Sequence, residues 1–183
     1  MTARARYSYI ENLVNQILDQ TGVRHPPVPV DEIIRNKGIG IRYSDLKDVS
    51  GVVVRQGDST VIGVNSTQSP VRIRFTLAHE LGHALLHKGK EVRFDKTFSY
   101  NLRSSVSEQG TDIEEIEANF FAASLLMPRR FIDTDARTHS IDIEDSKALR
   151  AISAEYGVSS QAMALRLVYV ARRLARSQTQ LPF

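Results

Sequence analysis

The sequence contains no cysteine, and it contains no run of about 18 apolar residues. Without cysteine the chain can form neither a disulfide nor a thiolate metal site, so any protein ligands of a metal must be histidines or carboxylates. The missing apolar run excludes a membrane-spanning helix. The basic start from Met1 to Arg6 is not followed by an apolar segment, so the sequence predicts no signal peptide. We therefore expect a cytoplasmic protein with no membrane partner.

Strong net charge is also lacking, because 24 Lys and Arg residues against 21 Asp and Glu residues leave a formal charge of +3. Part of the basic excess lies at the two ends of the chain, at Arg4, at Arg6 and in the segment Arg172 to Arg176. Such clusters can attract nucleic acid, but solvated helix faces carry them more often. The length of 183 residues suits one compact domain with a small appended subdomain.

The most informative stretch runs from His79 to His83 and has the pattern H-E-x-x-H. Residues four apart on a helix lie about 40° from each other around the axis, so His79 and His83 project from one face and can bind one ion. Glu80 is rotated about 100° from His79, which keeps it out of the coordination shell but near a metal-bound water. The motif predicts zinc-assisted hydrolysis, most often of a peptide bond, with Glu80 as general base.

The residues around this motif favour a helix from about Val71 to His87. Ser69 is a suitable N-cap, and Pro70 follows at a position where a helix start tolerates proline. Apolar residues recur at helical spacing, which disfavours a surface helix that carries the motif by chance; they are Phe75, Leu77, Leu81, Ala84 and Leu85.

The periodicity of the remaining chain predicts an α+β fold. It consists of a small antiparallel three-stranded sheet packed on a zincin helix core, with a C-terminal helix pair. We expect the metallopeptidase core in residues 1–130 and a helical subdomain, packed on the core, in residues 131–183. The polar segment Lys88 to Gly110 shows no clear period, and we expect it to cover the cleft. The predicted strands are Ile39–Tyr43, Gly51–Arg55 and Thr60–Asn65, and the other predicted helices are Ser8–Thr21, Val30–Lys37, Thr111–Leu126, Ile141–Tyr156 and Ser159–Arg176.

A catalytic zinc needs a third protein ligand, and the sequence restricts where that ligand can lie. The metzincin pattern is excluded because Leu86 and Gly89 occupy the positions of its glycine and third histidine. His87 lies one turn beyond His83, but three ligands in line along one helix cannot converge on a tetrahedral ion. We therefore interpret His87 as an outer-shell or packing residue.

Glutamates on the next predicted helix are better candidates for the third ligand. Glu114, Glu115 and Glu117 lie near its start, where acidic residues also interact favourably with the helix dipole. Thr111 and Glu114 form a capping-box pattern. Periodicity alone does not decide between Glu115 and Glu117.

Two segments, Arg74 to His87 and Glu115 to Pro128, resemble the ImmA/IrrE metallopeptidases. The second segment matches the pattern E-x-x-A-(N/D)-x-F-A-A-x-L-L-M-P, and the resemblance extends roughly from Asp31 to Leu167. By position it implies that Glu115 is the third zinc ligand of a gluzincin-like site. It also implies that Asn119, one turn later, supports a ligand from the second shell. Zn²⁺ is the implied metal, with Mn²⁺ as an alternative.

The resemblance also implies a substrate and a biological role. Members of the family resemble proteases that cleave helix-turn-helix repressors, so we expect a nearby-encoded XRE-type repressor as the protein substrate. Its cleavage would relieve repression of stress-response or mobile-element genes. The strand Thr60–Asn65 is a candidate edge for holding an extended substrate by β-augmentation. Tyr100, His139 and Tyr156 are candidates for stabilising the oxyanion.

The C-terminal helices support a second hypothesis, in which the protein is a DNA-binding or protein-binding regulator and its metal site is secondary. A glycine turn at Gly157 followed by Ser159 resembles a helix-turn-helix. However, this pair carries enough apolar surface to pack on the core or bind a repressor, and we favour that interpretation over direct DNA binding; the apolar residues are Val158, Met163, Leu167 and Val170.

Overall fold

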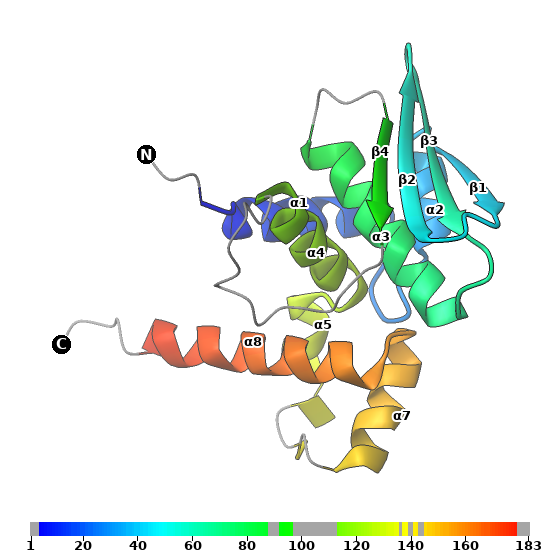
Figure 1. Ribbon diagram of the computed structural model, residues 1–183. Coiled ribbons are helices and arrows are strands. Elements are labelled where there is room, and N and C mark those ends of the chain that lie inside the picture. Colours follow the sequence, from blue (N-terminus) through cyan, green and yellow to red (C-terminus); the bar gives the residue numbers. More distant parts are fainter. Residues whose placement is uncertain are drawn as a thin grey trace.

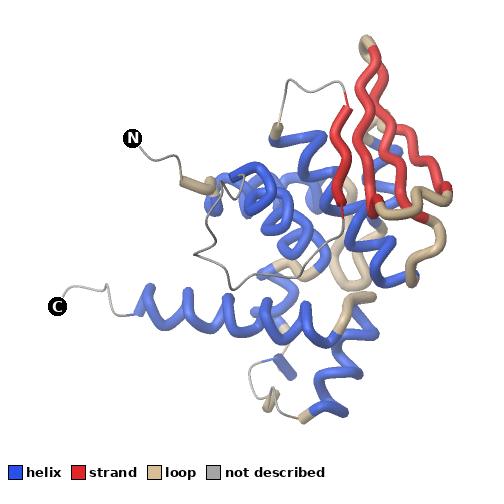
Figure 2. The backbone as a smooth tube through the Cα atoms, in the orientation of Figure 1, coloured by secondary structure: helices blue, strands red, loops and turns tan. Residues whose placement is uncertain are grey.

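The computed structural model describes residues 4–87, 92–96, 113–135, 137–138, 141–142 and 145–178. The strands gather on one side of a group of helices, and the last long helix runs along the end of that group (Figures 1 and 2). The helices are α1 (Tyr7–Gln20), α2 (Val30–Asn36), α3 (Pro70–Leu86), α4 (Ile113–Leu126), α5 (Arg129–Thr134), α7 (Ser146–Tyr156) and α8 (Ser160–Gln178). The strands are β1 (Gly40–Ser44), β2 (Val49–Gln56), β3 (Ser59–Asn65) and β4 (Val92–Lys96).

The predicted α+β class is confirmed, and the sheet differs from the prediction in two details. Its strand order is β1-β3-β2-β4, so a fourth strand comes from the segment that showed no period. Strand β2 pairs antiparallel with β3 and β4, but β1 pairs parallel with β3. Alternation of apolar and polar residues identifies a strand without specifying its neighbour or direction. The rest of Lys88 to Gly110, and Thr111 with its predicted cap, lie outside the described residues.

Helix α3 begins as its sequence predicts. The Ser69 hydroxyl accepts a hydrogen bond from the backbone N–H of Arg72 at 3.4 Å, and Pro70 occupies the first turn. At the other end, Arg55 of β2 donates to the carbonyls of His83 and His87 at 3.0 and 2.9 Å. A guanidinium at a helix C-terminus satisfies carbonyls that lack partners within the helix and opposes the negative end of its dipole. This contact fixes the end of α3 against the sheet.

Helices α3 and α4 pack unusually closely at Gly82. A Cβ atom at this position would lie 3.2 Å from the Cα of Ala118 and 3.1 Å from Cδ1 of Phe121. Glycine therefore allows the two backbones to approach further than any other residue would. Because α3 carries the H-E-x-x-H motif and α4 carries the candidate glutamates, this approach positions the site.

The C-terminal helices pack on the core. Helix α7 is capped by Asp145, which accepts hydrogen bonds from the backbone N–H groups of Lys147 and Ala148 at 2.9 and 3.1 Å. Gly157 ends it in the left-handed conformation, with φ 65° and ψ 39°. The four apolar residues singled out in the sequence all join the main core cluster; these are Val158, Met163, Leu167 and Val170. The boundary between residues 130 and 131 stays a prediction.

In the part of the chain that the structure describes, no helix has both the length and the apolar character needed to cross a bilayer.

Replacing Gly82 with Ala should destabilise the protein by about 1–3 kcal/mol, the usual cost of overpacking a core. The added methyl group would press on the backbone of α4 and force the helices apart. Urea unfolding of the wild type and the variant measures the difference. At an uncrowded helical position the same change stabilises by up to about 1 kcal/mol, so a more stable variant would contradict the close approach.

Candidate metal centre

Two buried histidines of α3 and one glutamate of α4 converge on a single point. The Nε2 atoms of His79 and His83 face each other at 2.8 Å. The carboxylate oxygens of Glu115 lie 3.4 Å from each of these nitrogens. Both histidines are fully buried, whereas the Glu115 side chain is 34% exposed. One side of the cluster is thus closed by protein, and the side with Glu115 is open to solvent.

This set of donors fits a divalent metal ion. The three ligand atoms all lie within 4.8 Å of one another. Two imidazoles and one carboxylate are ligands that zinc and related divalent ions accept, and three protein ligands leave a further position for water or substrate. Of the two glutamates that periodicity left open, the structure places Glu115 with the histidines. The assignment of the three as ligands stays a prediction.

Glu80 lies on the sheet side of α3, fully buried between the helix and β2. The space that its carboxylate fills is available because residue 51 of β2 is glycine. A Cβ atom at Gly51 would overlap with Oε1 of Glu80 and would lie 2.6 Å from Cγ2 of Thr76. The structure therefore holds this carboxylate in place between α3 and β2 and away from bulk water. The sequence predicts Gly51 as the start of a strand, and it gives no sign of this contact.

Beyond the candidate ligands, a hydrogen-bonded chain of polar groups extends from His83. Its Nδ1 atom lies 2.9 Å from Nδ1 of His87, and the Nε2 atom of His87 lies 3.2 Å from Oε2 of Glu117. Arg6 completes the chain, because its backbone N–H donates to Oε1 of Glu117 at 2.8 Å. The Arg6 guanidinium donates to both carboxylate oxygens, at 2.9 and 2.6 Å. We name these three residues, His87, Glu117 and Arg6, the supporting chain.

The supporting chain assigns a proton position to each histidine. If Nε2 of His83 binds a metal, its Nδ1 must carry the proton and donate to Nδ1 of His87. His87 then carries its own proton on Nε2 and donates it to Glu117. The hydrogen bond from Arg6 holds the pKa of Glu117 down at about 2, so this carboxylate is ionised at neutral pH and acts only as an acceptor. These hydrogen bonds of the supporting chain thereby fix the tautomer and the orientation of the His83 ring.

Part of this arrangement involves residues that the sequence singles out. His87 lies one turn beyond His83 and outside the metal cluster, and its part as an outer-shell residue stays a prediction. Glu117 is one of the two glutamates between which periodicity does not decide, and the structure places it beside His87 and Arg6. The sequence does not single out Arg6 as a site residue, because it is 111 residues away from Glu117 and belongs to a segment without periodicity.

Of the other predicted site residues, the structure describes Asn119 and Tyr156. Asn119 is half-buried one turn after Glu115 on α4, and its support of a ligand stays a prediction. Tyr100 and His139 lie outside the described residues. Tyr156 is described, and it is buried in α7 at 1% exposure.

The predicted substrate-binding edge at Thr60–Asn65 is wrong. This segment forms β3, which is hydrogen-bonded on both sides, to β1 and to β2. The parallel pairing of β1 with β3 covers the side of β3 that the prediction requires to be free. Within the described sheet the outer strands are β1 and β4, and β4 pairs with β2, the strand beside Glu80.

Comparison with known proteins shows that the candidate metal ligands and Glu80 lie within the part of the chain that matches one protein family. The pattern described as the IrrE N-terminal-like domain of a peptidase family matches residues 34–168. The chain is 37% identical over 75 residues to the radiation response metalloprotease IrrE of Deinococcus radiodurans, covering 41% of this chain and 21% of the relative. It is 40% identical over 73 residues to the protein of the same name from Deinococcus deserti, covering 40% and 24%. The matches thus span less than a quarter of either relative.

Replacing Glu117 with Gln should weaken metal binding by about 10–100-fold, the usual effect of losing a partner of a metal-bound histidine. The amide cannot accept from both His87 and Arg6 as the carboxylate does. Competition with a chromophoric chelator measures the affinity. Arg6→Gln should weaken it in the same direction, whereas Arg4→Gln is the matched control, since Arg4 is exposed. Equal affinity in Glu117→Gln and the wild type would show that the supporting chain does not act on the metal.

Proposed function

Because the chain belongs to the peptidase family with the IrrE N-terminal-like domain, we propose that it is a zinc-dependent endopeptidase with a gluzincin-like site. The membership confirms the resemblance that its two motifs indicated. The observation that carries the proposal is the convergence of His79, His83 and Glu115 from two helices, with Glu80 buried beside them. These three residues would hold Zn²⁺, and Mn²⁺ is the alternative ion that the same donors accept.

Each residue of the site has a defined part in peptide hydrolysis. The chemistry that zinc supplies at such a site is Lewis acidity, which polarises a carbonyl and lowers the pKa of water. Glu80 takes the proton of the attacking water and passes it to the leaving amine. Its burial between α3 and β2 fixes the carboxylate in one place, so little reorganisation is needed when the proton moves. His83 keeps the orientation that the supporting chain gives it.

The substrate that we propose is a helix-turn-helix repressor of the XRE type, encoded nearby, whose cleavage switches on stress-response or mobile-element genes. The two Deinococcus relatives are named radiation response metalloproteases, which supports a role in a stress response. Such a repressor works on DNA in the cytoplasm, and we place the protease there with it. An extended segment of the repressor could add to the sheet at β4, next to the strand beside Glu80.

The alternative, a regulator that binds DNA through α7 and α8, has less support. The apolar residues of this pair that we singled out lie in the main core, so packing accounts for them. Binding to duplex DNA that weakens steeply with salt would be the sign of a DNA-binding surface.

Glu80→Gln should abolish cleavage of the nearby repressor, with a loss of at least about 100-fold in rate, because the amide cannot accept a proton. Zinc stoichiometry should stay unchanged, since Glu80 lies outside the ligand set. Cleavage is followed by electrophoresis and mass spectrometry of the purified repressor mixed with the zinc-loaded protein. Full activity of Glu80→Gln would overturn the mechanism.

Glu115→Ala should lose both stoichiometric zinc and cleavage, because only two protein ligands remain. Glu114→Ala is the matched control, since Glu114 precedes it on α4 and does not belong to the cluster. Metal content after dialysis is measured by mass spectrometry. If Glu115→Ala retained one tightly bound zinc per chain, the choice of the third ligand would be wrong.

A further inference from the structure

A cavity lies at the junction of α1, α4, α5 and α8, apart from the candidate metal centre. Its volume is about 270 Å³, and its walls include Glu11 of α1, Ser124 of α4 and Arg166 of α8. Ser124 follows Glu115 by nine positions on α4, which places it about 180° around the helix from the metal ligand. The cavity is therefore on the opposite side of α4 from the candidate metal site.

The charged residues on the rim of this cavity are neutralised by partners. Arg129 pairs with Asp133 at 3.1 Å, and Arg130 pairs with Asp19 at 2.6 Å. Glu11 uses its Oε2 atom to pair with Arg173 at 2.8 Å. Among the described residues no carboxylate forms an ion pair with Arg166, and Glu11 acts on its charge only through longer-range attraction.

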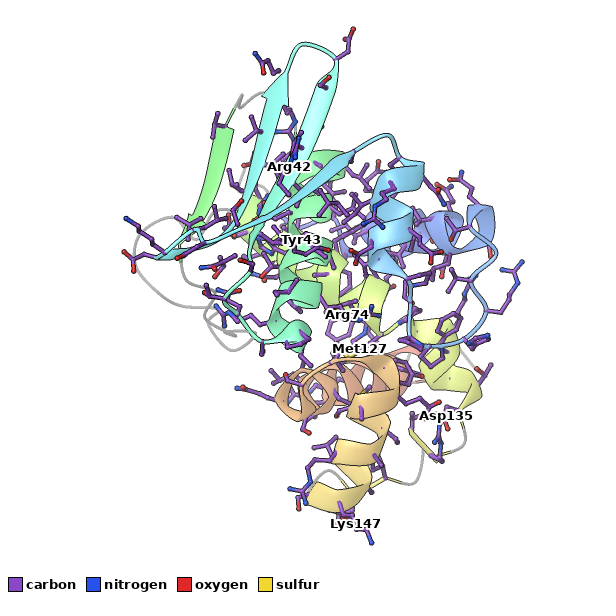
Figure 3. All side chains as sticks on the ribbon, turned by 90° about the vertical axis from the view of Figure 1, so that its right-hand side faces the viewer. Arg42, Tyr43, Arg74, Met127, Asp135 and Lys147 are labelled. Atoms are coloured by element: carbon purple, nitrogen blue, oxygen red, sulfur yellow. The ribbon has the colours of Figure 1, made fainter. Side chains whose placement is uncertain are left out.

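Arg166 is an unusual residue to leave unpaired, since it is only 2% exposed. Its Nε atom donates to the carbonyl of Met127 at 3.0 Å, at the junction between the core and the C-terminal helices (Figure 3). Its Nη2 atom is buried and has no hydrogen-bond partner in the described structure. Burial lowers the pKa of Arg166 to about 10, so the guanidinium is still charged at neutral pH.

Aromatic rings compensate this charge only in part. The guanidinium carbon lies 5.6 Å from the ring centroid of Phe120 and 5.5 Å from that of Tyr169. Cation–π contacts of this kind stabilise a buried cation less than a full counter-charge at hydrogen-bond distance would. Water in the cavity would supply hydrogen bonds but no negative charge. An anion in the cavity would supply both.

Two further buried atoms of the cavity wall define what kind of anion fits. The hydroxyl of Ser124 has no hydrogen-bond partner in the described structure, and neither does Oε1 of Glu11. A carboxylate can accept hydrogen bonds from Arg166 and Ser124 together. The Glu11 carboxylate pairs with Arg173 through its other oxygen, and its Oε1 is a hydrogen-bond acceptor, so the ligand should also carry a donor.

We propose that this cavity binds a small carboxylate that also carries a hydrogen-bond donor, as a hydroxy acid or an amino acid does. The ligand would bridge α1, α4 and α8 on the side of α4 that faces away from Glu115. This proposal concerns binding alone, and it does not depend on the protease activity. The volume of about 270 Å³ lies just below the range usual for drug-sized ligands, so the cavity suits a small organic molecule of this class.

The test is titration calorimetry of the full chain with glycolate, glycine and acetate at constant ionic strength, with chloride as the background anion. Glycolate or glycine should bind saturably with one site per chain, and acetate, which lacks the donor, should bind at least about tenfold more weakly. The ligand that binds should also raise the melting temperature as its concentration increases.

Two variants place the binding in this cavity. Ser124→Ala should weaken binding about tenfold, and Arg166→Met should abolish it. Ser153→Ala is the matched control, because Ser153 is an equally buried helical serine whose hydroxyl donates to the Leu149 carbonyl at 2.6 Å, outside the cavity. If Arg166→Met fails to fold, Ser124→Ala against Ser153→Ala still decides the question. Absence of saturable binding, or equal binding by the two serine variants, would overturn the proposal, as would a chloride site that excludes all three acids.

Discussion

The distance between α3 and α4 is the constraint on which the candidate metal centre depends. Helix geometry brings His79 and His83 together without help, because they are one turn apart on the same face. Glu115 comes from the neighbouring helix, and at Gly82 the two backbones approach so closely that an added Cβ atom would lie 3.2 Å from the Cα of Ala118. A second glycine, Gly51, leaves the space that the Glu80 carboxylate fills on the sheet side of α3. The site thus depends on two glycines, at positions where a larger residue would collide with its neighbours.

The buried charges on the two sides of α4, those of Glu117 and Arg166, differ in how far their partners compensate them. On the side of the metal centre, the ionised Glu117 receives three hydrogen bonds from Arg6 and lies beside His87, so its burial is compensated. This compensation makes it a fixed acceptor that can orient the histidines. On the other side, Arg166 is equally buried, and beyond a carbonyl and two aromatic rings it has only the longer-range attraction of Glu11. The first charge is thus compensated within the protein, and the second is the one for which we propose an external ligand.

The sequence predicted well what depends on short-range spacing. The H-E-x-x-H helix, its cap at Ser69 and the α+β class all follow from residues a few positions apart. It predicted less well what depends on pairing between distant segments. Periodicity does not decide between Glu115 and Glu117, which are two positions apart on the same helix. The family resemblance favours Glu115, and the structure shows that the two glutamates face different partners. Arg6 contacts Glu117 across 111 residues, and the parallel addition of β1 turned the expected edge strand into an inner one. No local pattern encodes either contact.

Anomalous diffraction from crystals of the zinc-loaded protein, measured at the zinc absorption edge, shows whether His79, His83 and Glu115 bind one metal ion. We expect one zinc peak per chain, with bonds of about 2.0–2.2 Å to Nε2 of both histidines and to the Glu115 carboxylate. His87 and Glu117 should stay outside bonding distance, in the supporting chain. A peak bonded to Glu117 or His87, or no peak between α3 and α4, would show that these three residues are not the ligands.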